Sequence, residues 1–123
     1  MYTCPDVVPR RPALSTPYCT FCEIIARREP AEILHEDEDV IVFRNRLRWV
    51  PIMLLAIPKA HLTQGQLWTD PILAKVGKVA AYVGAEHCPN GFRILSNFGR
   101  DAMQSQAHGH VHIIGGVHLG PYA

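Results

Sequence analysis

The sequence predicts one α+β domain, with a mostly antiparallel sheet of about five strands and two helices. Two observations support this fold class. Short runs of β-branched and apolar residues recur from residue 31 to the C-terminus and are typical of strands. Between them, residues 72–83 place their apolar side chains three and four positions apart, which is the spacing of one helix face.

The first 18 residues differ from the rest in composition, with four prolines and two adjacent arginines. Because proline lacks the amide hydrogen and restricts its neighbour, we expect residues 1–18 to form an extended arm and residues 19–123 the domain. Thr20 and Glu23 match a capping box, in which two side chains satisfy free backbone amides at a helix start. They predict a short helix over residues 21–28.

The strands and the second helix follow. Residues 31–36 and 40–44 are predicted to form a hairpin. The second of these strands is apolar on both faces, so we expect it to lie inside the sheet. The second helix begins at Asp70 and Pro71, because proline at the first helical position loses no amide that the helix needs. The remaining predicted strands are residues 53–57, 92–96 and 108–116, with a polar loop over residues 97–107.

Composition and charge restrict the class of protein. With 123 residues and 48% hydrophobic content, the chain is large enough for a core of its own. Twelve Lys and Arg against 11 Asp and Glu give a net charge of +1, so we expect neither nucleic acid nor a membrane surface as a partner. We find no transmembrane stretch and no export signal. We therefore expect a cytoplasmic protein whose four cysteines stay reduced.

The chemical centre of the sequence is the stretch HGHVHIIGG, which ends at Gly116. His108, His110 and His112 occupy every second position, so on a strand their three imidazoles share one face. Such a row has three interpretations. It forms a metal site, a covalent or acid–base catalytic site, or a set of half-exposed histidines without a chemical role.

The loop before the histidines narrows these alternatives. Asn97, Gln104 and Ser105 offer amide and hydroxyl groups, and Gly99 exposes backbone donors. Groups of this kind suit the oxygens of a phosphate. The combination indicates a site where histidines act on a phosphorylated compound.

Three segments of the chain together resemble the histidine-triad (HIT) family of nucleotide hydrolases and transferases. They are CTFCEIIARREPAEILHEDEDVIVF, IPKAH and SNFGRDAMQSQAHGHVHIIGG, in the order expected for the family. The resemblance covers about residues 19–123. The two glycines after the triad and the short GPYA tail are most similar to the branch of purine-nucleoside phosphoramidate hydrolases. The resemblance implies a HIT-like fold and a homodimer.

The resemblance also implies roles for the histidines. His110 would attack the α-phosphorus and form a nucleotidyl-histidine intermediate, and His112 would stabilise charge on the phosphate. His108 would hold the active strand in register. The implied reaction is hydrolysis of nucleoside phosphoramidates or related purine nucleotides. The alternatives are cleavage of dinucleoside polyphosphates and nucleotide binding with little catalysis.

The remaining site residues are assigned by the same resemblance. Gln104 and Ser105 would hold phosphate oxygens or the leaving group, and Asn97 would line the same pocket. Asn45 occupies the position where family members usually have an aspartate that accepts both ribose hydroxyls. The candidates for the purine slot, for which core packing is the alternative, are Phe21, Ile24, Ile25, Phe43 and Leu47.

Three residues depart from the family pattern. Asn45 offers one acceptor oxygen and no charge, and the loss of one charge-assisted hydrogen bond would weaken ribose binding about 10- to 100-fold. Met103 stands where glycine often precedes Gln-Ser, and its side chain would crowd the leaving-group side or push the loop outward. Met53 stands where relatives often have histidine. Because these departures lie outside the histidine triad, the sequence indicates the type of reaction more firmly than the substrate that the protein prefers.

Cys19 and Cys22 resemble half of the structural zinc site found in many bacterial relatives. The relatives complete that site with the first triad histidine, here His108, and with the histidine that Met53 replaces. Because a thioether is a poor zinc ligand, we expect no metal and two small, apolar-like cysteines beside the helix start. The substitutes for the missing ligand that the spacing leaves open are His35, His61 and Cys4.

Three arginines alternate after the interior strand, at Arg44, Arg46 and Arg48. Side chains at alternate positions share one face of an extended chain and would raise the local potential for phosphates. A solvated surface is the interpretation that we adopt. His61 is expected to structure the turn that it occupies.

Overall fold

The computed structural model describes residues 17–121. The arm predicted over residues 1–18 lies outside the described residues, apart from its last two. All five predicted strands are present. The elements in chain order are α1 (Thr20–Ile25), β1 (Ile33–Glu36), β2 (Val40–Arg44), β3 (Ile52–Pro58), α2 (Gln64–Leu67), α3 (Ile72–His87), β4 (Phe92–Leu95), the 3-10 helix η1 (Arg100–Ala102) and β5 (Val111–Gly115).

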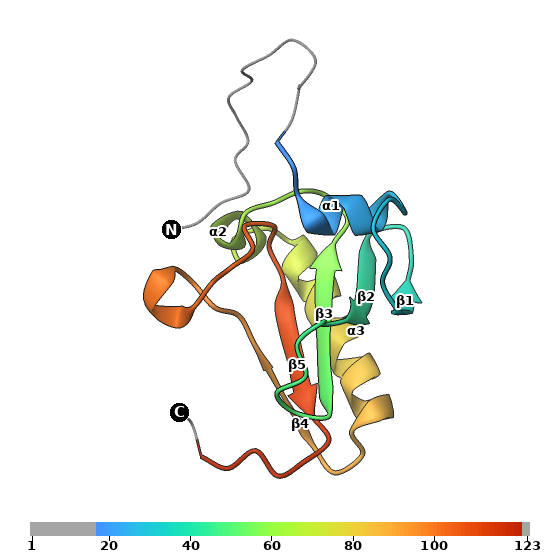
Figure 1. The fold of residues 1–123 in the computed structure, drawn as a ribbon, viewed down its shortest axis with the longest axis vertical. Helices are drawn as coiled ribbons and strands as arrows, with labels where there is room; N and C mark the ends of the chain where they lie inside the picture. Colours follow the sequence, from blue (N-terminus) through green and yellow to red (C-terminus); the bar gives the residue numbers. More distant parts are fainter. Residues whose placement is uncertain (1–16, 122–123) are drawn as a thin grey trace.

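The five strands form one sheet in the order β1-β2-β3-β5-β4, and every neighbouring pair is antiparallel. α3 runs along one face of this sheet, and α1 lies near one end of β2 (Figure 1). This arrangement confirms the predicted α+β fold class.

The interior strand β2 packs on both faces, as its continuous apolar run predicts. Val40 and Val42 belong to the core that α3 covers. Ile41 and Phe43 belong to a second core that includes side chains of α1. All four residues are buried. The second core forms the floor of the functional site described below.

The helices differ from the prediction more than the strands do. α1 ends at Ile25, and Arg27 just after it has a left-handed φ of 66°. The sequence does not predict α2 or η1, because three or four residues are too few to display a periodic apolar face. Among the described residues, no helix has the length and apolarity that crossing a membrane requires.

The predicted capping box at Thr20 and Glu23 is wrong. Cys19 occupies the N-cap of α1 without a side-chain cap, and Glu23 pairs instead with an arginine beyond the helix. A capping box is present at α2. There, Thr63 Oγ1 accepts a hydrogen bond from Gln66 N at 3.1 Å, and Gln66 Oε1 accepts one from Thr63 N at 2.8 Å. It fixes the start of a helix that contacts the histidine segment.

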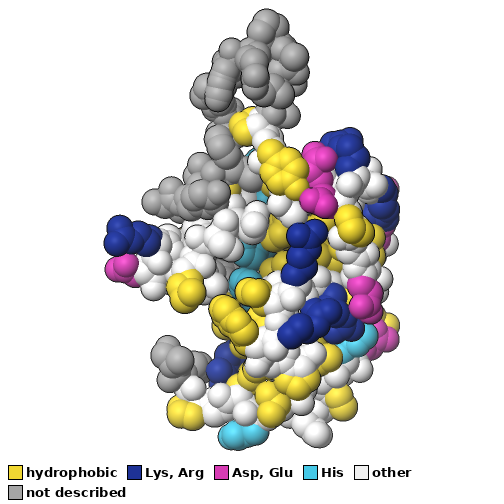
Figure 2. Space-filling view, viewed as in Figure 1, with side chains coloured by type: hydrophobic (Ala, Val, Ile, Leu, Met, Phe, Trp, Pro, Cys, Tyr) yellow, Lys and Arg dark blue, Asp and Glu magenta, His cyan; other side chains and the backbone are white. Residues whose placement is uncertain are grey.

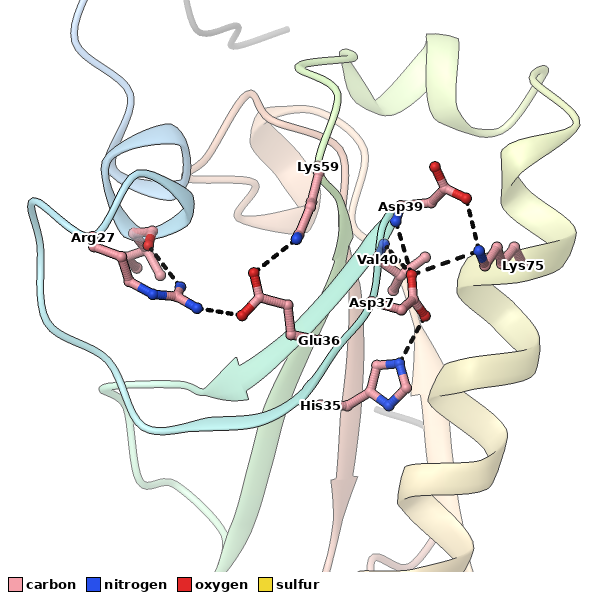
Figure 3. A network of polar contacts seen from close by, with 9 residues as sticks. Arg27, His35, Glu36, Asp37, Asp39, Val40, Lys59 and Lys75 are labelled. Atoms are coloured by element: carbon pink, nitrogen blue, oxygen red, sulfur yellow. Dashed lines mark hydrogen bonds and ion pairs between the residues drawn. The ribbon is translucent and has the colours of Figure 1, made fainter.

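A polar network joins the β1–β2 hairpin to α3 (Figure 3). Asp37 Oδ1 accepts hydrogen bonds from the backbone amides of Asp39 and Val40 at 2.8 and 2.9 Å, and Oδ2 lies 2.8 Å from His35 Nε2. Lys75 of α3 places Nζ 2.7 Å from Asp39 Oδ2. These contacts, the one from His35 first, hold the pKa of Asp37 well below its usual value. His35 is therefore engaged in the hairpin.

Candidate functional site

A pocket of about 720 Å³ opens on the sheet face opposite α3. Figure 2 shows histidine side chains within a hollow on this face, with hydrophobic side chains around it and Lys or Arg side chains beside it. The residues predicted for the site that line this pocket are Phe21, Ile24, Phe43, Asn45, Leu47, Asn97, Gln104, Ser105, His110 and His112. The sequence therefore singled out ten of the residues that line this pocket.

The three histidines do not all lie on a strand, contrary to the prediction. Only His112 belongs to β5. His108 and His110 precede the strand, and His108 is bridged to Thr63 at the start of α2. His110 and His112 both line the pocket, with ring centroids 5.0 Å apart, whereas His108 is fully buried and outside the pocket wall. Two of the three histidines therefore line the pocket, and the third is buried outside its wall.

The backbone of His110 is held from two sides. Its N–H donates to Gln64 Oε1 at 2.8 Å, and its carbonyl accepts from Ser96 Oγ at 2.6 Å. Gln64 is fully buried on α2, and its Nε2 donates to Asn97 O at 3.0 Å. Gly109 permits the close approach of α2, because a Cβ there would lie 2.9 Å from a side chain of that helix. No sequence pattern points to Gln64, since its partner is 46 residues away.

Hydrogen bonding also fixes the tautomer of His110. Its Nδ1 lies 2.7 Å from the carbonyl oxygen of His108, which can only accept, so Nδ1 carries the proton and Nε2 does not. Burial lowers the pKa of His110. Burial, together with the neighbouring His110, lowers the pKa of His112 to about 4. Both imidazoles are therefore neutral at pH 7, and His110 Nε2 has a free lone pair.

Gln104 braces the loop before the histidines. Its Oε1 accepts from Gly99 N at 2.8 Å, and its Nε2 donates to Gln106 O at 3.0 Å. Ser105 beside it is exposed and lines the pocket. Met103 has a φ of 62°, in the left-handed region that favours glycine, and its side chain is 73% exposed. The methionine therefore stands at the pocket rim with most of its side chain in solvent.

Apolar side chains form another wall of the pocket. Phe21, Ile24 and Phe43 line it and also belong to the core beneath it, so core packing is confirmed and the purine slot stays a prediction. Leu47 lines the pocket and is 46% exposed. Ile25 packs against the core and is not part of the pocket wall.

The segment after β2 completes the wall. Asn45 Oδ1 accepts a hydrogen bond from Leu47 N at 3.0 Å. Arg44, Arg46 and Arg48 also line the pocket. The arginines that the sequence assigns to a solvated surface therefore border the site.

Four potential metal ligands meet beside the buried end of the triad. Cys19, Cys22, His61 and His108 each offer one ligand atom, and the four atoms lie within 4.8 Å of one another. Cys22 Sγ is 3.2 Å from His61 Nδ1 and 3.5 Å from His108 Nδ1. Cys19 Sγ is 3.7 Å from His108 Nδ1. This group could hold a metal ion.

The loss of histidine at position 53 does not leave the group short of a ligand. Met53 lies in the pocket wall, with Sδ 3.1 Å from Trp49 N, and is not part of the cysteine–histidine group. His61, one of the substitutes that the spacing leaves open, offers the fourth potential ligand atom. His108 Nε2 is bonded to the carbonyl of Pro58 at 2.8 Å, so its Nδ1 is the nitrogen beside the thiols.

The fold and the site define a small α+β protein with two neutral histidines in a pocket on the open face of an antiparallel sheet. The sequence of this chain matches the family model of the HIT domain over residues 26–119. The chain belongs to the HIT family, in agreement with the segments around its three histidines.

Relatives and solved structures agree with this assignment. The chain is 35% identical over 101 residues to Protein HitA of Neisseria gonorrhoeae, covering 79% of this chain and 94% of the relative. A HIT family hydrolase from Clostridium thermocellum has a TM-score of 0.77 at 36% identity, covering 85% of this chain and 95% of that one. A histidine triad nucleotide-binding protein from Sulfolobus tokodaii, described as hypothetical, has a TM-score of 0.73 at 34% identity, covering 85% and 72%.

Proposed function

We propose that this protein is a nucleotide hydrolase or nucleotidyl transferase that cleaves nucleoside phosphoramidates or related purine nucleotides. The observation that carries the proposal is the contact of 2.7 Å between His110 Nδ1 and the carbonyl oxygen of His108, while among residues 17–121 no hydrogen-bond partner lies at Nε2. A neutral imidazole held in one orientation is suited to attack phosphorus. Similarity to a HIT family hydrolase and to a histidine triad nucleotide-binding protein supports this activity.

The proposed reaction has two displacements at the α-phosphorus. First, the lone pair of His110 Nε2 forms a bond to phosphorus while the bond from phosphorus to the leaving group breaks. The leaving amine departs with that electron pair and takes up a proton from solvent. The oxygen of a water molecule then forms a bond to phosphorus and releases a proton to solvent, while the bond from phosphorus to Nε2 breaks. His110 regains its lone pair, and the nucleoside monophosphate is released. Two displacements with lower barriers replace one with a high barrier.

The neighbouring groups would bind the phosphate and the nucleoside. His112, in ring contact with His110, and the hydroxyl of Ser105 would stabilise charge on the phosphate oxygens. Asn97 would line the same site, and Gln104 would act through the loop that it braces. Asn45 would face the ribose. The purine slot would be formed by Phe21, Ile24, Phe43 and Leu47.

A zinc ion held by the cysteine–histidine group is also part of the proposal. Zinc–ligand bonds of about 2.0–2.3 Å in a tetrahedron place neighbouring ligand atoms roughly 3.5 Å apart. The sulfur–nitrogen separations here are 3.2, 3.5 and 3.7 Å. Burial, with the adjacent Cys19, raises the pKa of Cys22 to about 12, so a thiolate forms there only beside strong positive charge. Cys19, Cys22, His61 and His108 would hold the ion, which would supply that charge and cross-link the four residues.

His108 would then connect the metal group to the catalytic histidine. Its Nδ1 faces the thiols, while its carbonyl oxygen accepts the Nδ1–H of His110. Fixing the imidazole of His108 fixes the backbone from which His110 is oriented. His108 would position His110 in this way.

We also infer a homodimer in the cytoplasm. β4 is an edge strand, and Ile94 on it is 38% exposed. Tyr82 on the neighbouring α3 is 63% exposed. Apolar side chains exposed on an edge strand and an adjacent helix suit pairing with a second copy. The described cysteines are free thiols, which suits a reducing compartment.

Substitution of the nucleophile tests the proposed activity. His110→Ala should lower turnover of adenosine 5′-phosphoramidate by at least about 1,000-fold and leave the affinity for adenosine 5′-monophosphate nearly unchanged. Mass spectrometry of quenched wild-type reactions should detect a nucleotidyl adduct on His110. His118→Ala, at an exposed histidine outside the pocket wall, is the control. Wild-type turnover by His110→Ala would refute the assignment.

The same measurements separate the competing functions. Preferential turnover of dinucleoside polyphosphates would favour their cleavage as the activity. Binding of the monophosphate without turnover of either substrate would favour a nucleotide-binding module, for which Met103 at the rim is the supporting observation.

A further inference from the structure

The end of β2 and the segment that follows it give one wall of the pocket an unusual chemistry. Arg44, Asn45, Arg46 and Arg48 all line the pocket within five consecutive positions. Three guanidinium groups and one amide therefore border the pocket. The partners of these groups decide what that wall can bind.

Two of the three arginines are already paired. Arg44 Nε lies 3.0 Å from Glu32 Oε1, and Arg46 Nη2 lies 3.8 Å from Glu29 Oε1. Arg48 differs, because among the described residues no carboxylate lies within 4.0 Å of it. Its guanidinium donates instead to the backbone oxygen of Asn45. Arg48 therefore keeps its full positive charge and free N–H donors at the pocket.

The side chain of Asn45 adds a donor to this wall. Its Oδ1 accepts from Leu47 N at 3.0 Å, a bond that requires the oxygen on that side of the amide. The remaining group is the NH2, for which no acceptor is present among residues 17–121. A carboxylate would offer two oxygens to a ribose diol, whereas the amide of Asn45 has a single oxygen that already accepts one hydrogen bond. Asn45 and Arg48 together form a wall of hydrogen-bond donors.

The sheet register places this wall at the far end of the site from the histidines. Asn45 N donates to Met53 O, and Met53 pairs with Ile114, two residues after His112. Strands are about 4.8 Å apart and rise about 3.3 Å per residue, so Asn45 and His112 are separated by roughly 12 Å between Cα atoms. With side chains reaching inward from both ends, this span suits one nucleotide.

We propose that Arg48 and Asn45 form a second anion subsite, which takes a phosphate on the ribose of the bound nucleotide. This inference rests on the proposed function and names its substrate class: nucleotides that carry a 2′- or 3′-phosphate besides the reacting 5′-phosphate. A planar guanidinium can bind two phosphate oxygens, and the amide of Asn45 donates to a third. A carboxylate at position 45 would repel this group, whereas asparagine does not.

Calorimetry on the full chain tests the subsite without depending on turnover. The probes are adenosine 5′-monophosphate, adenosine 3′,5′-bisphosphate and adenosine 2′,5′-bisphosphate. We expect one bisphosphate to bind about 10-fold more tightly than the monophosphate. The preference should decrease at high salt, because Arg48 is exposed and its charge is screened.

Two variants and one control connect the preference to these residues. Arg48→Gln should reduce it to within about threefold. Asn45→Asp retains an oxygen for Leu47 N but adds a negative charge, so it should remove or reverse the preference. Arg28→Gln removes the same charge at an exposed residue outside the pocket wall and should leave the preference unchanged.

The outcomes separate this inference from the function on which it rests. Equal binding of monophosphate and bisphosphates by the wild type, or an undiminished preference in Arg48→Gln, would overturn the subsite and leave the proposed function standing. Failure of every nucleotide to bind would overturn both.

Discussion

The two ends of the pocket are built differently. At the histidine end, His110 is 4% exposed, and its N–H, its carbonyl and its Nδ1 each have a separate hydrogen-bond partner. At the arginine end, residues 46–49 are exposed, and within residues 17–121 the guanidinium of Arg48 is hydrogen-bonded only to its own loop, through the backbone oxygen of Asn45. One end is braced by several segments, and the other is a single loop.

The difference corresponds to two requirements of the proposed reaction. Attack on phosphorus requires an imidazole held within a fraction of an ångström of the productive position. Recognition of an anion tolerates a side chain that adjusts to its ligand, and loops commonly carry such groups. Changes at the histidine end should therefore alter rate and stability, and changes at the arginine end should alter ligand preference.

Disruption of the cysteine–histidine group should have the largest effect on the stability of the protein. Cys22→Ser or His61→Ala should abolish bound zinc and lower Tm by on the order of 10 °C, because the cross-link to His108 is lost. Elemental analysis and thermal melts of protein purified without chelator measure both effects. Cys88→Ser, at a buried cysteine outside the group, should retain the metal. Wild-type protein without zinc would contradict the assignment.

Gln64 should have the next largest effect, on rate alone. Gln64→Leu removes the acceptor for His110 N and should lower kcat about 100-fold, with little change in the Kd of adenosine 5′-monophosphate. Gln66→Ala is the matched control, since it removes the capping box of the same helix at a cost of about 1 kcal/mol without touching His110. Equal losses of kcat in both variants would assign the effect to the stability of α2 rather than to the bond.

The depressed pKa of His112 predicts an acid-sensitive histidine end. Unfolded His112 would take up a proton near pH 6.5, whereas the folded protein resists protonation down to about pH 4. Its contribution to stability is therefore complete above pH 6.5 and is lost as the pH falls towards 4, by on the order of 2 kcal/mol. Urea unfolding at pH 7.5 and pH 5 measures this loss. His112→Gln should show a smaller loss, and an identical loss would contradict the attribution.

Met103 should have the smallest effect. Met103→Gly relieves the left-handed φ of 62° and should raise the free energy of unfolding by up to about 1 kcal/mol. Urea unfolding measures the gain, and Ala102→Gly, at a neighbouring residue without a positive φ, should give none. A destabilised Met103→Gly would show that contacts of the methionine outweigh its backbone strain.

Sequence reasoning succeeded where local patterns carry the information. The continuous apolar run from Val40 to Phe43 predicts an interior strand, and both of its faces are buried. The apolar spacing after Pro71 predicts α3, whose residues Val76, Ala80 and Val83 fill the core. Such patterns repeat within a few residues, so they can be recognised in the sequence without knowledge of the fold.

Sequence reasoning failed where a residue has a partner other than the one that its local pattern indicates. Glu23 has the spacing of a capping residue but pairs with Arg28, five positions away. The histidines alternate as on a strand, yet the chain leaves the sheet at His110 because Gln64 and Thr63 bind that segment. Periodicity describes what a segment can form and does not identify its tertiary partners.

The sequence determined the family of this protein, because the spacing of His108, His110 and His112 and the segments around them are contiguous features. Only the tertiary structure decided which residues lie beside them. His61 joins Cys19 and Cys22 as a potential ligand, Met53 does not, and Gln64 accepts the hydrogen bond from His110 N. These choices depend on contacts across about 40 to 90 residues, which chain folding creates and local spacing does not encode.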